Sequence, residues 1–106
     1  MENRYCEELM EAIEKSDGNY NADKIKEAYE FAEQAHDGQK RKSGDPYISH
    51  PVEVAKRLIE YGADDASIIA SLLHYTVEDT SVTLEDIKKQ FGEEVALLVD
   101  GVTKLK

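Results

Sequence analysis

The stretch DDASIIASLLHYTVED, residues 64–79, decides the fold of this chain. Its large apolar residues recur at the three- and four-residue spacing of one helix face. Asp64 or Asp65 can cap the first turn, because a short side-chain oxygen there accepts a hydrogen bond from a free backbone N–H. The apolar stripe stops at Leu73, and His74 follows directly, so we expect a buried helix that ends near a histidine. The residues on the inward face are Ile68, Ile69, Leu72 and Leu73.

Helical spacing continues on both sides of this stretch, and no segment alternates with the period of two that a half-buried strand requires. The sequence therefore predicts one all-α domain over residues 1–106, a helical bundle of about five to six helices. The last helix is still running at Leu105, so we expect the domain to be incomplete at its C-terminus. The further helices are expected over about residues 2–15, 23–37, 50–61, 83–91 and 93–105.

The composition of the chain excludes several classes of function. The formal net charge is −10, and such a surface repels phosphate backbones, so we expect no binding to DNA. No apolar run is long enough to span a bilayer and the N-terminus is polar, so we expect a cytoplasmic protein without membrane contact. One cysteine, Cys6, excludes an internal disulfide and a cysteine zinc site. Any metal would need histidine and carboxylate ligands.

A short basic run, KRK at residues 40–42, lies in the loop-like stretch HDGQKRKSGDPY. On charge alone, a basic triplet of this kind is typical of a solvated loop. The sequence contains no GxGxxG or GxxxxGK motif. Nucleotide binding would therefore need an arrangement other than a glycine-rich phosphate loop.

Two of the three histidines, His50 and His74, are expected at helix ends, where side chains from different helices can converge. His74 precedes Glu78 by four residues and Asp79 by five, so one more helical turn would place His74 and Glu78 on one face. Such nitrogen and oxygen atoms suit Mn²⁺, Fe²⁺ or Zn²⁺, or they can hold and deprotonate a water molecule. The alternative is that each histidine is a helix cap or a surface residue and that the carboxylates open an acidic turn.

Four motifs occur together along the chain: RKSG at residues 41–44, the dipeptide His50-Pro51, HYTVED at residues 74–79 and DGVTKL at residues 100–105. With these motifs, the chain resembles the N-terminal hydrolase domain of the RelA/SpoT family over roughly residues 24–105. Members of this family are HD-domain proteins that make and degrade the alarmone (p)ppGpp. The resemblance implies an HD-domain-like helical bundle and a Mn²⁺-dependent ppGpp 3′-pyrophosphohydrolase, in a family that is bifunctional with GTP pyrophosphokinase.

The resemblance also implies a metal centre with assigned residues. His50 and His74 match the two histidine ligands of the family's Mn²⁺, and Glu78 and Asp79 match the carboxylates that act on the nucleophilic water. A divalent cation lowers the pKa of a bound water to near neutrality. It also offsets the charge of a pyrophosphate that an acidic domain would otherwise repel.

A nucleotide-binding loop is the second implication of the resemblance. Arg41 and Lys42, with Ser43 beside them, match the residues that embrace the guanine and the phosphates. The implied partner is therefore a guanine nucleotide, ppGpp or pppGpp, since both share the end that is cleaved.

Two departures from the family pattern affect the metal centre. Tyr75 stands where the family has the aspartate that follows the second histidine, and a further metal-binding aspartate of the family lies beyond residue 106. A tyrosine hydroxyl is neutral at pH 7 and is a poor ligand compared with an ionised carboxylate. We therefore expect the centre to be weak or inactive. Tyr75 would instead fill the metal site with its ring while its hydroxyl finds a hydrogen bond.

Three interpretations follow from the sequence. The first is a Mn²⁺-dependent hydrolase that removes the 3′-pyrophosphate of ppGpp. The second, which we favour, is a catalytically impaired relative that binds guanine nucleotide or serves as a regulatory or interaction module. The third is a helical piece whose exposed apolar strip makes it form a homo-oligomer.

Overall fold

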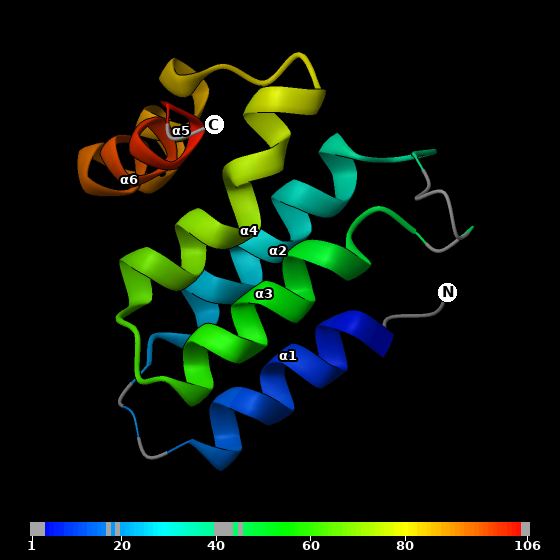
Figure 1. The fold of residues 1–106 in the computed structure, drawn as a ribbon, viewed down its shortest axis with the longest axis vertical. Coiled ribbons are helices and arrows are strands. Elements are labelled where there is room, and N and C mark those ends of the chain that lie inside the picture. Colours follow the sequence, from blue (N-terminus) through cyan, green and yellow to red (C-terminus); the bar gives the residue numbers. More distant parts are fainter. Residues whose placement is uncertain (1–3, 17, 19, 40–43, 45, 105–106) are drawn as a thin grey trace.

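The computed structural model describes residues 4–16, 18, 20–39, 44 and 46–104. Within these residues the chain forms six α-helices and no strand, which confirms the predicted all-α fold (Figure 1). None of the helices in this part of the chain has the length and apolar character needed to cross a bilayer. The helices are α1 (Arg4–Lys15), α2 (Ala22–Ala35), α3 (Ser49–Glu60), α4 (Asp65–Asp79), α5 (Leu84–Phe91) and α6 (Glu93–Lys104).

Helix α4 is the centre of the bundle. It packs against α2, α3 and α6, while α1 covers α2 and α3, and α5 packs on α6. Figure 1 shows α3 between α1 and α4, with the α5–α6 pair on the other side of α4. The candidate site residues that the structure describes therefore lie on α4 itself or on α3, which packs against it.

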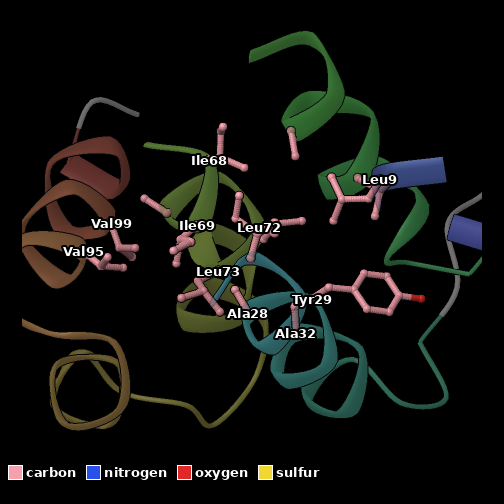
Figure 2. Close-up of a cluster of buried hydrophobic side chains, with 14 of the residues drawn as sticks. Leu9, Ala28, Tyr29, Ala32, Ile68, Ile69, Leu72, Leu73, Val95 and Val99 are labelled. Carbon is pink, nitrogen blue, oxygen red and sulfur yellow. The ribbon is translucent and has the colours of Figure 1, made fainter. Parts of the chain in front are cut away.

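The apolar face of α4 forms the middle of the core (Figure 2). Ile68, Leu72 and Leu73 are completely buried, and Tyr29 of α2 is 2% exposed. Full burial of a large aliphatic side chain contributes about 1.5–3 kcal/mol. The inward face predicted from the spacing of apolar residues is thus confirmed, and it holds α4 in place. Other buried residues of this cluster include Leu9, Ala28, Ala32, Ile69, Val95 and Val99.

The ends of the helices follow local rules of capping. The side chain of Asp64 accepts a hydrogen bond of 3.0 Å from the backbone N–H of Ser67, so Asp64 is the cap of α4. Thr83 and Asp86 form a reciprocal capping box at the start of α5. Gly92 follows α5 with φ of 100°, a conformation that glycine adopts without strain.

The expectation that α4 ends near His74 is wrong. The helix continues to Asp79, and Thr80 is its C-cap. Thr76 is completely buried and donates a hydrogen bond of 2.6 Å to the carbonyl of Leu73. The apolar stripe stops at Leu73, but no helix-breaking residue follows it, so the helix extends for more than another turn.

Candidate functional site

His50 and Tyr75 meet where the first turn of α3 packs against α4. The Tyr75 hydroxyl lies 3.1 Å from Nε2 of His50, and the two ring centroids are 5.2 Å apart. Tyr75 also packs against the neighbouring His74, with ring centroids 4.4 Å apart. The Tyr75 ring therefore contacts both histidines that the sequence analysis assigned to a metal centre. The expectation that its hydroxyl finds a hydrogen bond is confirmed.

His74 and Glu78 lie one helical turn apart on α4 and face each other, as helical spacing predicts. Nε2 of His74 is 2.5 Å from Oε2 of Glu78. The two side chains are 11% and 17% exposed. The imidazole nitrogen and the carboxylate oxygen thus form a close, largely buried pair within one helix.

Asp79 ends α4 and receives hydrogen bonds from the connection between α2 and α3. The hydroxyl of Tyr47 donates to the Asp79 carboxylate, and Nε2 of Gln39 donates to the Asp79 carbonyl at 3.2 Å. Burial raises the pKa of the Tyr47 phenol, and the hydrogen bond and negative charge of Asp79 raise it further. Tyr47 is therefore a neutral donor to Asp79 at physiological pH.

His36 stacks on the ring of Tyr47 and so supports this arrangement. It is 3% exposed, and its ring stacks on Tyr47 with centroids 4.4 Å apart and an interplanar angle of 16°. Nδ1 of His36 lies 3.1 Å from Oε1 of Gln39. Sequence reasoning missed the roles of His36, Gln39 and Tyr47. No sequence pattern indicated these roles, because the contacts join the end of α2 and the connection after it to the end of α4.

A sequence model described as the HD domain matches residues 28–106. The chain belongs to the HD domain family.

Relatives of this HD domain carry names from (p)ppGpp metabolism, which confirms the resemblance to the RelA/SpoT family. A guanosine-3′,5′-bis(diphosphate) 3′-pyrophosphohydrolase of Aquifex aeolicus is 54% identical over 99 residues, which cover 92% of this chain and 14% of the relative. A GTP pyrophosphokinase of Streptomyces coelicolor is 60% identical over 81 residues, covering 76% of this chain and 10% of the relative. A GTP pyrophosphokinase rsh of Brucella ovis is 46% identical over 99 residues, covering 93% and 13%. The chain thus spans about a tenth to a seventh of these relatives.

Tyr75 contacts both histidines of the expected centre, and His74 lies close to Glu78. His50 comes from α3, while His74, Glu78 and Asp79 come from the second half of α4. The expected nucleotide-binding residues Arg41, Lys42 and Ser43 lie outside the described residues.

The HD family implies a divalent metal, and the donor atoms described here do not fit one. Nε2 of His50 lies 3.1 Å from the Tyr75 hydroxyl, and Nε2 of His74 lies 2.5 Å from Oε2 of Glu78. The described residues contain no group of three or more histidine, cysteine, aspartate or glutamate side chains suited to a metal ion. Carboxylate oxygens are the ligands that suit a hard divalent cation, and the position of Tyr75 carries a phenol in place of one.

A groove of about 390 Å³ runs along α4 next to this centre. His74 and Tyr75 form one end of it, and most of its lining is apolar. Pockets of this size and character hold small organic ligands in many proteins. The remaining lining residues are Val54, Leu58, Ser67, Ala70, Ser71, Leu98 and Val102.

Proposed function

We propose that this HD domain belongs to guanosine tetraphosphate (ppGpp) metabolism and that its hydrolytic activity is weak or absent. The relation to ppGpp is supported by the Aquifex relative, whose name describes removal of the 3′-pyrophosphate of this nucleotide. That relative covers nearly the whole chain at 54% identity. We extend the same proposal to pppGpp, which carries the same 3′ end.

The contact between Tyr75 and His50 is the observation that carries this proposal. In the RelA/SpoT pattern an ionised aspartate occupies the position of Tyr75 and ligates Mn²⁺. Here the hydroxyl lies 3.1 Å from the histidine nitrogen that would face the cation. A neutral phenol at this position supplies no negative ligand. Its hydroxyl also forms a hydrogen bond with His50, the second expected ligand. We infer that the chain does not retain Mn²⁺ firmly.

Glu78 and Asp79 are the groups that we propose to act on water or on the nucleotide. In hydrolysis, a water oxygen forms a bond to the phosphorus on the 3′-oxygen, the water proton passes to a carboxylate, and the 3′-oxygen leaves and takes up a proton. Asp79 is held by a neutral hydroxyl, and Glu78 is held by His74. These contacts support the proposed roles of the two carboxylates, and a bound divalent metal would supply the activation of the water.

The alternative proposal is a non-catalytic module that binds guanine nucleotide or regulates another domain. The apolar groove beside Tyr75 favours this alternative, because a purine can bind against apolar and aromatic surfaces. We assign Arg41 and Lys42, with Ser43, to the phosphates and base of the nucleotide, since phosphate binding needs positive charge in so acidic a chain.

We also propose where the domain is located and how it associates. The proposed location is the cytoplasm. We propose no affinity for DNA, because the net charge of −10 repels phosphate backbones. We also propose a homo-oligomer formed through α6, whose outer face exposes Leu97 by 65%, Val102 by 43% and Leu98 by 37%.

Hydrolysis and metal retention test the proposal together. The purified chain is incubated with Mn²⁺ and ppGpp, and released pyrophosphate is measured beside the His74→Ala variant. We expect equal, background rates from both proteins and substoichiometric metal after dialysis. Turnover by the unaltered chain that His74→Ala abolishes would show that the centre is active and would overturn the proposed impairment.

Nucleotide binding is tested by calorimetric titration with ppGpp. Arg41→Ala should weaken binding, whereas Lys15→Ala should not, because Lys15 is an exposed residue of α1 that pairs with Glu11. The absence of any heat of binding at millimolar ppGpp would contradict the nucleotide-binding proposal.

A further inference from the structure

Asp79 is exposed at the end of α4, yet it is held at two points by the connection between α2 and α3. Tyr47 donates to its carboxylate and Gln39 donates to its carbonyl. An exposed aspartate at a helix end ordinarily samples several side-chain rotamers, because no neighbour restricts it. The hydrogen bond from Tyr47 selects one orientation of this carboxylate.

The ring of Tyr47 is itself held on two sides. One face stacks on buried His36 at a centroid distance of 4.4 Å, and the ring makes an edge contact with Tyr75 at 6.0 Å and 73°. Its backbone N–H donates to the carbonyl of Gln39 at 3.2 Å. Because the backbone and the ring are both fixed, the hydroxyl can reach only a small region, and Asp79 lies in it.

The chemistry of the donor matters as much as its position. A lysine or arginine in place of Tyr47 would neutralise Asp79 by forming an ion pair, whereas a phenol donates a hydrogen bond without adding charge. The phenol therefore restricts the orientation of the Asp79 carboxylate without pairing it with a positive charge. A carboxylate with both properties is suited to accept a proton from water or to orient a bound molecule.

We propose that Tyr47 is a positioning residue that sets the orientation of the Asp79 carboxylate at this site. This inference rests on the proposed function, in which Asp79 acts on water or on ppGpp. Tyr47 acts through Asp79 and touches no nucleotide itself. His36 and Gln39 are the supports that place Tyr47 and the backbone of Asp79.

Tyr47→Phe is the variant that tests the proposal, because it keeps the stacked ring and removes only the hydroxyl. Tyr20→Phe is the matched control: the Tyr20 hydroxyl donates to the carbonyl of Ala63 at 2.7 Å, next to the opposite end of α4. ppGpp affinity is measured by calorimetry for both variants. Because binding must then also order the Asp79 side chain, Tyr47→Phe should weaken binding by on the order of tenfold, and Tyr20→Phe should bind as the unaltered chain does.

A double variant separates positioning from a general loss of structure. Asp79→Ala removes the acceptor, so adding Tyr47→Phe to it should change ppGpp affinity less than about twofold, since the two changes act on one interaction. Equal weakening by Tyr47→Phe with and without Asp79 would overturn the proposal. So would unchanged affinity in Tyr47→Phe alone.

A measurement without nucleotide keeps this inference distinct from the proposed function. Three-bond NMR couplings between the backbone nitrogen and Cγ report the rotamer of Asp79. We expect a single rotamer in the unaltered chain and in Tyr20→Phe, and averaged couplings in Tyr47→Phe. If the unaltered chain does not bind ppGpp, the proposed function fails and these couplings alone decide the role of Tyr47. A single Asp79 rotamer in Tyr47→Phe would then contradict it.

Discussion

The side chains in the two halves of α4 make different kinds of contact. The first half, Ile68 to Leu73, is buried in the apolar core, where α4 packs against α2, α3 and α6. The second half, His74 to Asp79, makes specific polar contacts: His74 with Glu78, Tyr75 with His50, and Asp79 with Tyr47. The first half secures the fold, and the second half carries residues of the proposed site. Substitutions in the two halves should therefore change different measurements.

The largest effect on stability is expected in the apolar half. Leu72 is completely buried, so Leu72→Ala leaves a cavity and should lower the free energy of unfolding by about 2–5 kcal/mol. Urea unfolding followed by circular dichroism measures this change. Tyr61→Ala is the control, since Tyr61 is 85% exposed and its truncation should cost less than about 0.5 kcal/mol. Equal losses in the two variants would show that α4 is not the centre of the core.

A smaller loss is expected in the polar half. Tyr75→Phe removes the hydroxyl that contacts His50 and keeps the ring. The loss of one neutral hydrogen bond should cost about 0.5–1.5 kcal/mol by the same urea measurement. A loss as large as that of Leu72→Ala would contradict the division of α4 into a half that secures the fold and a half that does not.

Alkaline pH should produce the smallest effect. The pKa of Tyr47 is raised in the folded chain, by burial first and then by Asp79, so the folded state favours the neutral phenol. The stability that this provides is complete below the unfolded pKa of about 10 and is lost as pH rises through the folded-state pKa. Tyr47→Phe should therefore reduce the fall in unfolding free energy above about pH 10.

Tyr29 acts in the same direction and limits the size of that reduction. Burial and a hydrogen bond to Glu33 raise its pKa as well. The alkaline loss should thus persist in part in Tyr47→Phe and fall further when Tyr29→Phe is added. An identical pH dependence in the unaltered chain and in Tyr47→Phe would show that Tyr47 ionises as a solvated tyrosine does.

The same division explains how much of the molecule the sequence could predict. The apolar half of α4 and its Asp64 cap follow from spacing and from a neighbouring residue, which are local properties. The C-terminal end of α4 was missed, because the apolar stripe stops at Leu73 while buried Thr76 and the pair of His74 with Glu78 still belong to the helix.

The polar contacts of the site were only partly predictable. Family resemblance brought His50 and Tyr75 into one site, since both match positions of a known motif. The pair of Tyr47 and Asp79 joins a connection to a helix end, and neither periodicity nor motif spacing specifies such a contact. The packing of α2 and α3 against α4 creates it.

Manganese binding by the unaltered chain and by Tyr75→Asp tests the central claim most directly. Tyr75→Asp replaces a neutral phenol with an anionic oxygen beside His50 and His74. In calorimetric titrations with Mn²⁺, we expect negligible binding by the unaltered chain at micromolar metal and at least roughly tenfold tighter binding by Tyr75→Asp, which corresponds to about 1.4 kcal/mol. Stoichiometric micromolar binding by the unaltered chain, lost in His74→Ala, would contradict the claim that Tyr75 disables the metal centre.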